Sequence, residues 1–157
     1  MINREQLRAY IIRPALQAIN SYSENAEELL MFTCATESLG GFLLRQIKGP
    51  ALGIFQMEPA TYHDIWRNFI NLKPALATMM AKNLNITSIP NEERLVYDLK
   101  YSATIARIHY LRVSQPLPNK NDVDAMWDYY KKYYNTPLGK ATKQKAIQDY
   151  QKYAVGK

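Results

Sequence analysis

The chain has 157 residues, a length typical of one domain, and its 47% hydrophobic and 22% charged residues exclude wholesale disorder. No apolar run approaches the roughly 18 residues of a membrane-spanning helix, and the single cysteine, Cys34, excludes an intrachain disulfide. The net charge of +6 resides in residues 131–157, which hold seven lysines against one acid. We therefore expect one globular domain over residues 1–157 with a basic end.

The first third of the chain predicts helices and one irregular segment. Apolar residues at helical spacing predict a helix over residues 7–19, in which Pro14 either kinks the helix or begins a second one. Overlapping capping boxes predict a helix that begins near Ser23 and ends at about Ser38. Residues 41–57 mix glycine and proline with apolar residues, which predicts a loop or a small β-hairpin.

The rest of the chain predicts further helices. Prolines that fit the first helical position predict helices over residues 59–69 and from Pro74 onward. A long periodic stretch predicts a helix over residues 92–113, and Asp122 fits the N-cap of a helix that ends at about Tyr134. A last helix is expected over about residues 140–153. The predicted fold class is mainly α, with the hairpin as its one possible β-element.

A carboxyl group at the end of an apolar helix face is the first catalytic candidate. Glu37 shares a face with Leu30 and Cys34. Apolar neighbours and the helix C-terminus both disfavour the anion, so the pKa of Glu37 should rise. A glutamate that keeps its proton near neutral pH can donate it to a leaving group. From position alone, an ordinary glutamate at a helix end is the simpler interpretation.

The residues after Glu37 change that balance. Glu37-Ser38 is followed by Phe42 and then by the segment Gly-Ile-Phe-Gln-Met-Glu-Pro-Ala-Thr over residues 53–61, in which Gln56 lies 19 residues after Glu37. This pattern resembles the catalytic domain of soluble lytic transglycosylases and goose-type lysozymes in the lysozyme-like superfamily. It combines about seven fixed positions with the spacing of that family.

A second family element lies near the end of the chain. Tyr134-Asn135 is similar to the Tyr-Asn pair that closes a later helix in this family. The family normally continues with Ala-Gly, whereas this chain has Thr-Pro-Leu before Gly139. The resemblance thus spans about residues 29–139, and its second element is the weaker one.

The resemblance implies a lysozyme-like fold with a groove for peptidoglycan. Glu37 would protonate the glycosidic oxygen between N-acetylmuramic acid and N-acetylglucosamine. In lytic transglycosylases the same glutamate then deprotonates the sugar's own C6 hydroxyl, which closes a 1,6-anhydro ring without water. One carboxylate suffices, an exception to the rule of two. No cofactor and no metal are expected.

The resemblance also implies roles for other residues. Tyr134 would orient the acid, and Asn135 would fix the turn. The expected substrate-binding residues are Ser38, Gln56, Met57, Tyr134 and Asn135. Glu58 stands where transglycosylases usually have an apolar residue and goose-type lysozymes use a carboxylate to position water. It is therefore either a second catalytic carboxylate in a hydrolytic muramidase or a residue that favours the N-terminus of the next helix.

The remaining charged and polar features leave alternatives open. The basic, tyrosine-rich helix over about residues 140–153 suits an anionic cell-envelope polymer, or it is a solvated surface. A helical nucleic-acid-binding module and a non-catalytic phage structural protein are competing hypotheses, but neither explains the motif around Glu37. A metal site built on His63 and His109 would need a third ligand that the sequence does not identify, so both are interpreted as surface or core residues.

The N-terminus bears on where such an enzyme would act. Met1–Arg8 carries charges where a signal peptide has its apolar segment, so no secretory signal is expected. Together with the modest size and the basic end, this favours a bacteriophage enzyme made in the infected cell. It would reach the cell wall through a holin pore as an endolysin, or as part of the virion.

Overall fold

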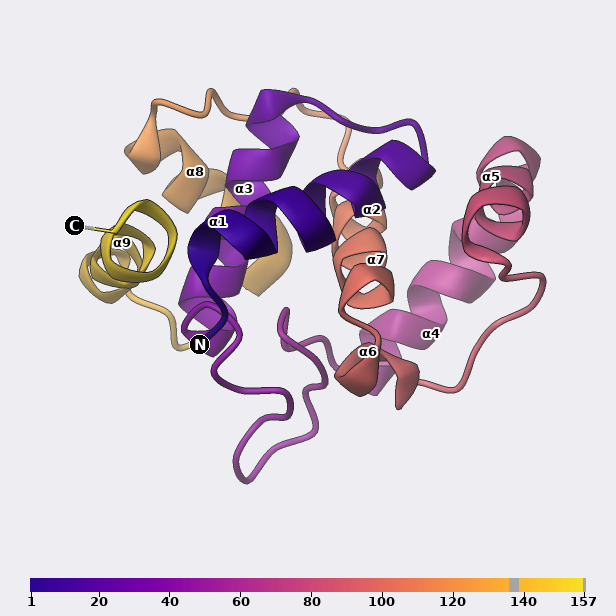
Figure 1. Cartoon of the computed structure of the whole chain (residues 1–157), viewed down its shortest axis with the longest axis horizontal. Helices are drawn as coiled ribbons and strands as arrows, with labels where there is room; N and C mark the ends of the chain where they lie inside the picture. Colours follow the sequence, from indigo (N-terminus) through magenta and orange to yellow (C-terminus); the bar gives the residue numbers. More distant parts are fainter. Residues whose placement is uncertain (136–138, 157) are drawn as a thin grey trace.

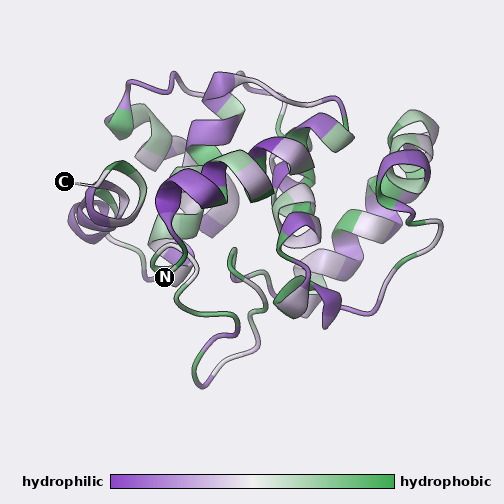
Figure 2. Cartoon of the chain, viewed as in Figure 1, coloured by the Kyte–Doolittle hydropathy of each residue, from purple (hydrophilic) through white to green (hydrophobic). Residues whose placement is uncertain are grey.

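The computed structural model describes residues 1–135 and 139–156, in which helices and loops form no β-sheet (Figure 1). The prediction of a mainly α fold class is therefore confirmed. Within the described residues, no helix is long and apolar enough to cross a membrane. The longer helices carry both hydrophilic and hydrophobic residues, as expected for helices that cover a shared core (Figure 2).

The N-terminal helical segment is continuous through the proline that was expected to kink or restart it. It consists of α1 (Arg4–Gln6), the π-helical turn η1 (Leu7–Ile12) and α2 (Arg13–Ala18). Pro14 lies in the first turn of α2, where its missing N–H is least costly. The π-helical turn η1 ends just before α2, so the change from π-helical to α-helical hydrogen bonding occurs next to Pro14.

Helix α3 (Glu24–Ser38) carries the catalytic candidate on its last turn. The Ser23 side chain accepts a hydrogen bond from the Ala26 N–H, which confirms the predicted start. The helix ends at Leu39, whose φ of 55° is left-handed and whose N–H bonds back to Ala35. The predicted end at Ser38 is therefore also confirmed.

The segment over residues 41–57 is an irregular loop rather than the hairpin that was considered. Its only ladder elements are two isolated antiparallel bridges, Arg45 to Leu52 and Leu52 to Met57. Gly53 explains why no regular strand forms. Its φ is +78°, and an added Cβ would lie 2.3 Å from the carbonyl oxygen of Leu95. Close packing of this backbone therefore replaces strand pairing.

The middle of the chain forms shorter helices than the periodicity suggests. Helices α4 (Pro59–Asn68) and α5 (Pro74–Leu84), with the short η2 (Ile70–Leu72) between them, confirm both proline-initiated starts. The prediction of a single helix over residues 92–113 is wrong. This region forms two helices, α6 (Arg94–Tyr97) and α7 (Leu99–Leu111). They are separate because Asp98 leaves the helical conformation and caps α7, where its side chain accepts a hydrogen bond from the Tyr101 N–H.

The C-terminal part contains two helices that each end in a π-turn. Helix α8 (Val123–Tyr130) is capped by Asp122 and continues as η3 (Lys131–Asn135), which confirms the predicted boundaries. Helix α9 (Lys143–Tyr150) begins after Thr142 and continues as η4 (Gln151–Val155). It packs beside α3 and lies next to the N-terminal segment (Figure 1).

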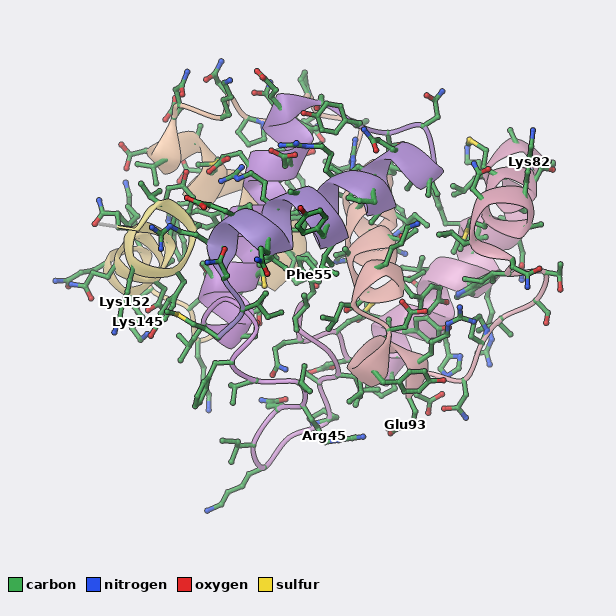
Figure 3. All side chains as sticks on the ribbon, in the orientation of Figure 1. Arg45, Phe55, Lys82, Glu93, Lys145 and Lys152 are labelled. Carbon is green, nitrogen blue, oxygen red and sulfur yellow. The ribbon has the colours of Figure 1, made fainter. Side chains whose placement is uncertain are left out.

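Two clusters of buried apolar residues form the core, and α7 contributes to both. One cluster joins the N-terminal segment, α3, α8 and α9, and includes the fully buried Phe55, which is labelled in Figure 3. The other joins α4 and α5 to Leu52 and Met57, in the second half of the loop 41–57. Helix α7 presents Ala103 and Tyr110 to the first cluster and Tyr101 and Ile105 to the second. The candidate site lies where these clusters adjoin.

Candidate active site

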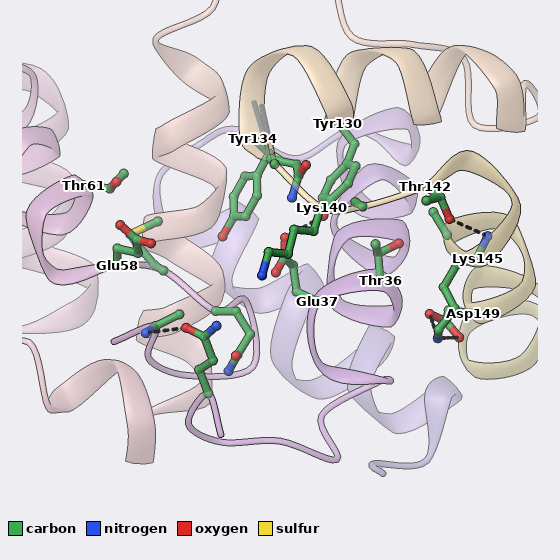
Figure 4. A pocket seen from close by; sticks show the side chains of 18 of the residues that line it. Thr36, Glu37, Glu58, Thr61, Tyr130, Tyr134, Lys140, Thr142, Lys145 and Asp149 are labelled. Carbon is green, nitrogen blue, oxygen red and sulfur yellow. Dashed lines mark hydrogen bonds and ion pairs between the residues drawn. The ribbon is translucent and has the colours of Figure 1, made fainter. Parts of the chain in front are cut away.

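A cleft of about 700 Å³ runs across the end of α3. Residues of α4 and of the loop before it line one side, and residues from η3 onward and α9 line the other. Figure 4 shows Glu37 between these two sides, with Glu58 and Thr61 on one and Lys145 and Asp149 on the other. The cleft therefore extends in both directions from the Glu37 carboxyl, as binding of an extended chain requires.

Glu37 has the protonation behaviour that the sequence predicts for an acid. Burial raises its pKa from 4.5 to about 7, and a hydrogen bond from Tyr130 partly opposes that rise. The Tyr130 hydroxyl donates to Oε1 of Glu37 over 2.6 Å. Oε2 has no hydrogen-bond partner in residues 1–135 and 139–156. Near neutral pH a large share of Glu37 is thus protonated, with one oxygen held and the other available to the cleft.

The tyrosine that holds Glu37 is one helical turn before the one expected. Tyr134 was predicted to orient the acid, but its hydroxyl donates to the carbonyl oxygen of Phe55 over 2.7 Å. Its ring lies against Tyr130, with centroids 6.0 Å apart and planes 19° from parallel. Tyr134 therefore fixes the loop 41–57 and buttresses Tyr130, while Tyr130 contacts Glu37. The prediction for Tyr134 is corrected in this respect, although Tyr134 does line the cleft.

Ser38 does not lie in the cleft, in contrast to the expectation that it binds substrate. It is fully buried, and its hydroxyl donates to the carbonyl oxygen of Ile54 over 2.6 Å. The Ser38 Oγ in turn accepts from the Gly41 N–H over 3.0 Å. Ser38 thus connects the end of α3 to the loop that carries Gln56. The Glu-Ser pair therefore has one residue in the cleft and one that fixes the backbone behind it.

Gln56 and Met57 both line the cleft, as expected. Gln56 has a left-handed φ of 48°, which is uncommon for a residue with this side chain. Its amide Nε2 donates to the carbonyl oxygen of Gly53 over 2.9 Å, so the side chain is fixed against its own turn. A residue kept in such a conformation at the edge of a cleft is consistent with a binding role.

Glu58 is the second carboxylate of the cleft. It is the N-cap residue of α4, but its side chain makes no capping hydrogen bond. It is exposed, and it forms no ion pair or hydrogen bond with the residues that the structure describes. Its side chain is therefore available to the cleft.

Asn135 has the structural role that the sequence suggested, at the margin of the cleft. Its Oδ1 accepts from Nζ of Lys131 over 2.8 Å, and the same ammonium donates to the carbonyl oxygen of Gly139 over 2.7 Å. Lys131 therefore links the end of η3 to the chain that follows it. Residues 136–138, the Thr-Pro-Leu that precedes Gly139, lie outside the described residues.

The lysines of the C-terminal helix are partly neutralised by neighbouring acids. Lys143 pairs with Asp124 over 2.9 Å, and Lys145 pairs with Asp149 over 2.6 Å. Lys145 also lines the cleft, whereas Lys152 lies in η4. The basic segment is therefore less cationic at its surface than the sequence count suggests.

The structure also shows the surroundings of the single cysteine and of the two histidines. Cys34 is fully buried, and burial raises the pKa of its thiol to about 12, so it is a small core residue as predicted. His63 lies 3.1 Å from a carboxylate oxygen of Glu92. His109, by contrast, lines the cleft, which the sequence did not indicate. No group of three potential metal ligands is found in the described part of the chain.

Comparisons with protein-family models, curated proteins and solved structures gave no match for this chain. The motif residues and the geometry of the cleft are therefore the features that point to a function.

Proposed function

We propose that the chain is a peptidoglycan-cleaving glycosidase with a lysozyme-like fold, in which Glu37 is the catalytic acid. The bond cleaved is the β-1,4 linkage between N-acetylmuramic acid and N-acetylglucosamine. The observation that carries the proposal is the Glu37 carboxyl in an open cleft, with a pKa raised to about 7 and one oxygen held by Tyr130. The motif resemblance around Glu37 supplies the substrate class.

The proposed reaction needs one carboxyl group. Protonated Glu37 donates its proton from Oε2 to the glycosidic oxygen, and the bond from the muramic acid C1 to that oxygen breaks. The C6 hydroxyl oxygen of the same sugar attacks C1, and the Glu37 carboxylate takes the hydroxyl proton. The 1,6-anhydro product forms, and the acid is regenerated without water. Tyr130 keeps its proton because burial raises its pKa, so it donates to Oε1 throughout.

A hydrolytic muramidase of the goose type is the second candidate, and the position of Glu58 favours it. The Glu58 side chain lines the same cleft as Glu37 and is not used to cap α4. A carboxylate there supports activation of a water molecule on the far side of the sugar. The chemical nature of the released ends separates this candidate from the transglycosylase.

The proposed setting is a bacteriophage enzyme that acts on the bacterial cell wall as an endolysin or a virion component. Contact with anionic envelope polymers through the lysines of residues 140–152, in α9 and on either side of it, is part of the proposal. The pairing of Lys143 and Lys145 with acids limits its strength. High salt should then weaken retention on cell walls modestly, and replacement of Lys140 and Lys152 by Gln should do the same.

The direct test is clearance of a purified peptidoglycan suspension by the intact chain and by Glu37→Gln. Clearance by the intact chain and its loss in the variant are expected. If a control lysozyme digests the same walls and the intact chain does not, the enzymatic proposal fails. Steeply salt-dependent binding to duplex DNA in that case would instead support the nucleic-acid-binding hypothesis.

A further inference from the structure

His109 is a cleft residue that neither motif includes. It lies in the last turn of α7, and its ring lines the cleft. The Tyr134 ring meets it edge to face, with centroids 5.0 Å apart and planes at 73°. The imidazole is thus packed in one position beside residues that the proposed function already uses.

Two charged residues behind His109 determine which ring nitrogen carries the proton. The Nη2 group of Arg112 donates to Nδ1 of His109 over 2.9 Å. A guanidinium group has donors only, so Nδ1 must present its lone pair and the proton must be on Nε2. Asp64 on α4 holds Arg112 in turn through a 2.6 Å contact with Nη1. This chain of contacts selects one tautomer of the neutral ring.

The charged and titratable surroundings keep that ring neutral. Burial and the positive charge of Arg112 lower the pKa of His109 to about 4, although Asp64 acts in the opposite direction. The Tyr134 ring packs against the imidazole, and Glu58 lines the same cleft. At neutral pH, His109 is therefore a single uncharged donor.

That donor has no partner in the described part of the chain. The Arg112 contact is the only hydrogen bond of His109 among residues 1–135 and 139–156. Among the described residues, Thr36 Oγ1 is the fully buried side-chain polar atom that lacks a hydrogen-bond partner. Nε2 of His109 also lacks a partner but is not fully buried, so its N–H is accessible from the cleft.

We propose that the Nε2–H of His109 donates to the carbonyl oxygen of an acetamido group on the bound glycan. The inference rests on the proposed function and adds a substrate-positioning residue to it. An uncharged donor suits an uncharged acceptor such as an amide carbonyl oxygen. Met57 and Tyr134 supply apolar surface for the acetamido methyl group. A sugar held in this way is placed against Glu37.

The first test is nitrogen-15 NMR of the histidine rings in the full chain carrying Glu37→Gln, which binds without turnover. The free protein should show His109 with its proton on Nε2 at neutral pH. Chitotetraose should shift both this Nε2 resonance and the Gln56 amide. Cellotetraose, which has the same hydroxyl framework without acetamido groups, should leave the Nε2 resonance unchanged.

Each other outcome counts against the inference in a distinguishable way. A proton on Nδ1 overturns it directly. A shift at Gln56 without one at His109 overturns the inference and leaves the proposed function intact. An equal response to cellotetraose overturns the acetamido assignment. No shift anywhere in the cleft, with a chitotetraose-binding control lysozyme responding normally, would overturn the inference together with the proposed function.

Matched variants give a second test that does not depend on NMR. The amide nitrogen of Gln corresponds to Nε2 of His, whereas that of Asn corresponds to Nδ1. We expect His109→Asn to weaken chitotetraose binding by roughly tenfold, the size of one hydrogen bond, and His109→Gln to restore most of it. Thermal unfolding of both variants controls for folding. Equal binding by two folded variants would contradict the donor role of Nε2.

Discussion

The raised pKa of Glu37 makes the stability of the protein depend on pH in a way that one substitution isolates. The pKa of this carboxyl is about 7 in the folded protein against an ordinary 4.5. Below pH 4.5 the group is protonated in both states and carries no penalty. Between pH 4.5 and 7 the carboxyl is ionised in the unfolded state and still protonated in the folded state, so stability falls across this range and the loss is complete above about pH 7. At about 1.4 kcal/mol per pH unit, the full loss is about 3 kcal/mol.

Glu37→Gln removes this penalty while keeping an oxygen that can accept from Tyr130. We expect the variant and the parent to unfold at the same temperature at pH 4 and the variant to unfold roughly 10 °C higher at pH 8. Thermal unfolding followed by circular dichroism across this pH range measures the difference. Glu58→Gln is the control, because its exposed side chain should give a small difference that does not grow with pH. A pH-independent difference for Glu37→Gln, or a variant less stable at pH 8, would refute the reasoning.

Three further substitutions test the surroundings of the acid. Tyr130→Phe removes a donor that favours the Glu37 anion, so the alkaline limb of the pH–rate profile should move to higher pH; an unchanged limb would argue against this contact. Ser38→Ala leaves the buried Ile54 carbonyl and the Gly41 N–H without their partner and should lower the free energy of unfolding in urea by about 2 kcal/mol. Gly53→Ala should lower the free energy of unfolding by at least as much in the same assay. Gly53 has a φ of +78°, and an added Cβ would lie 2.3 Å from the Leu95 carbonyl oxygen. A decrease below about 1 kcal/mol would contradict this close packing.

Helix starts were the part of the fold that the sequence predicted best, because their signals are local. Ser23 and Asp122 accept the hydrogen bonds expected of N-caps, and Pro59 and Pro74 begin helices. The break at Asp98 was missed, since the apolar period continues across it. Asp98 bonds the N–H three residues later, a capping pattern that a search for internal N-caps could have found.

The sequence predicted Glu37 as the candidate acid of the site but did not predict all of the residues around it. The motif spacing identified Glu37, Gln56 and Met57, which the cleft brings together. Tyr130 and Tyr134 lie one helical turn apart on one face, so only the packing of α8 against α3 decides which hydroxyl reaches the acid. The position of His109 in the cleft likewise depends on tertiary contacts. Asp64 and Arg112, which hold it, are 48 residues apart in sequence.

The most direct test of the central claim is mass spectrometry of muropeptides released from purified peptidoglycan by the intact chain and by Glu37→Gln. The proposal predicts products one water lighter than reducing muropeptides from the intact chain and none from the variant. Reducing-end products would instead establish the hydrolytic reaction and make Glu58 a catalytic candidate. Equal release by Glu37→Gln would contradict the assignment of Glu37 as the catalytic acid, and no release by the intact chain from walls that a control lysozyme digests would contradict the proposed activity itself.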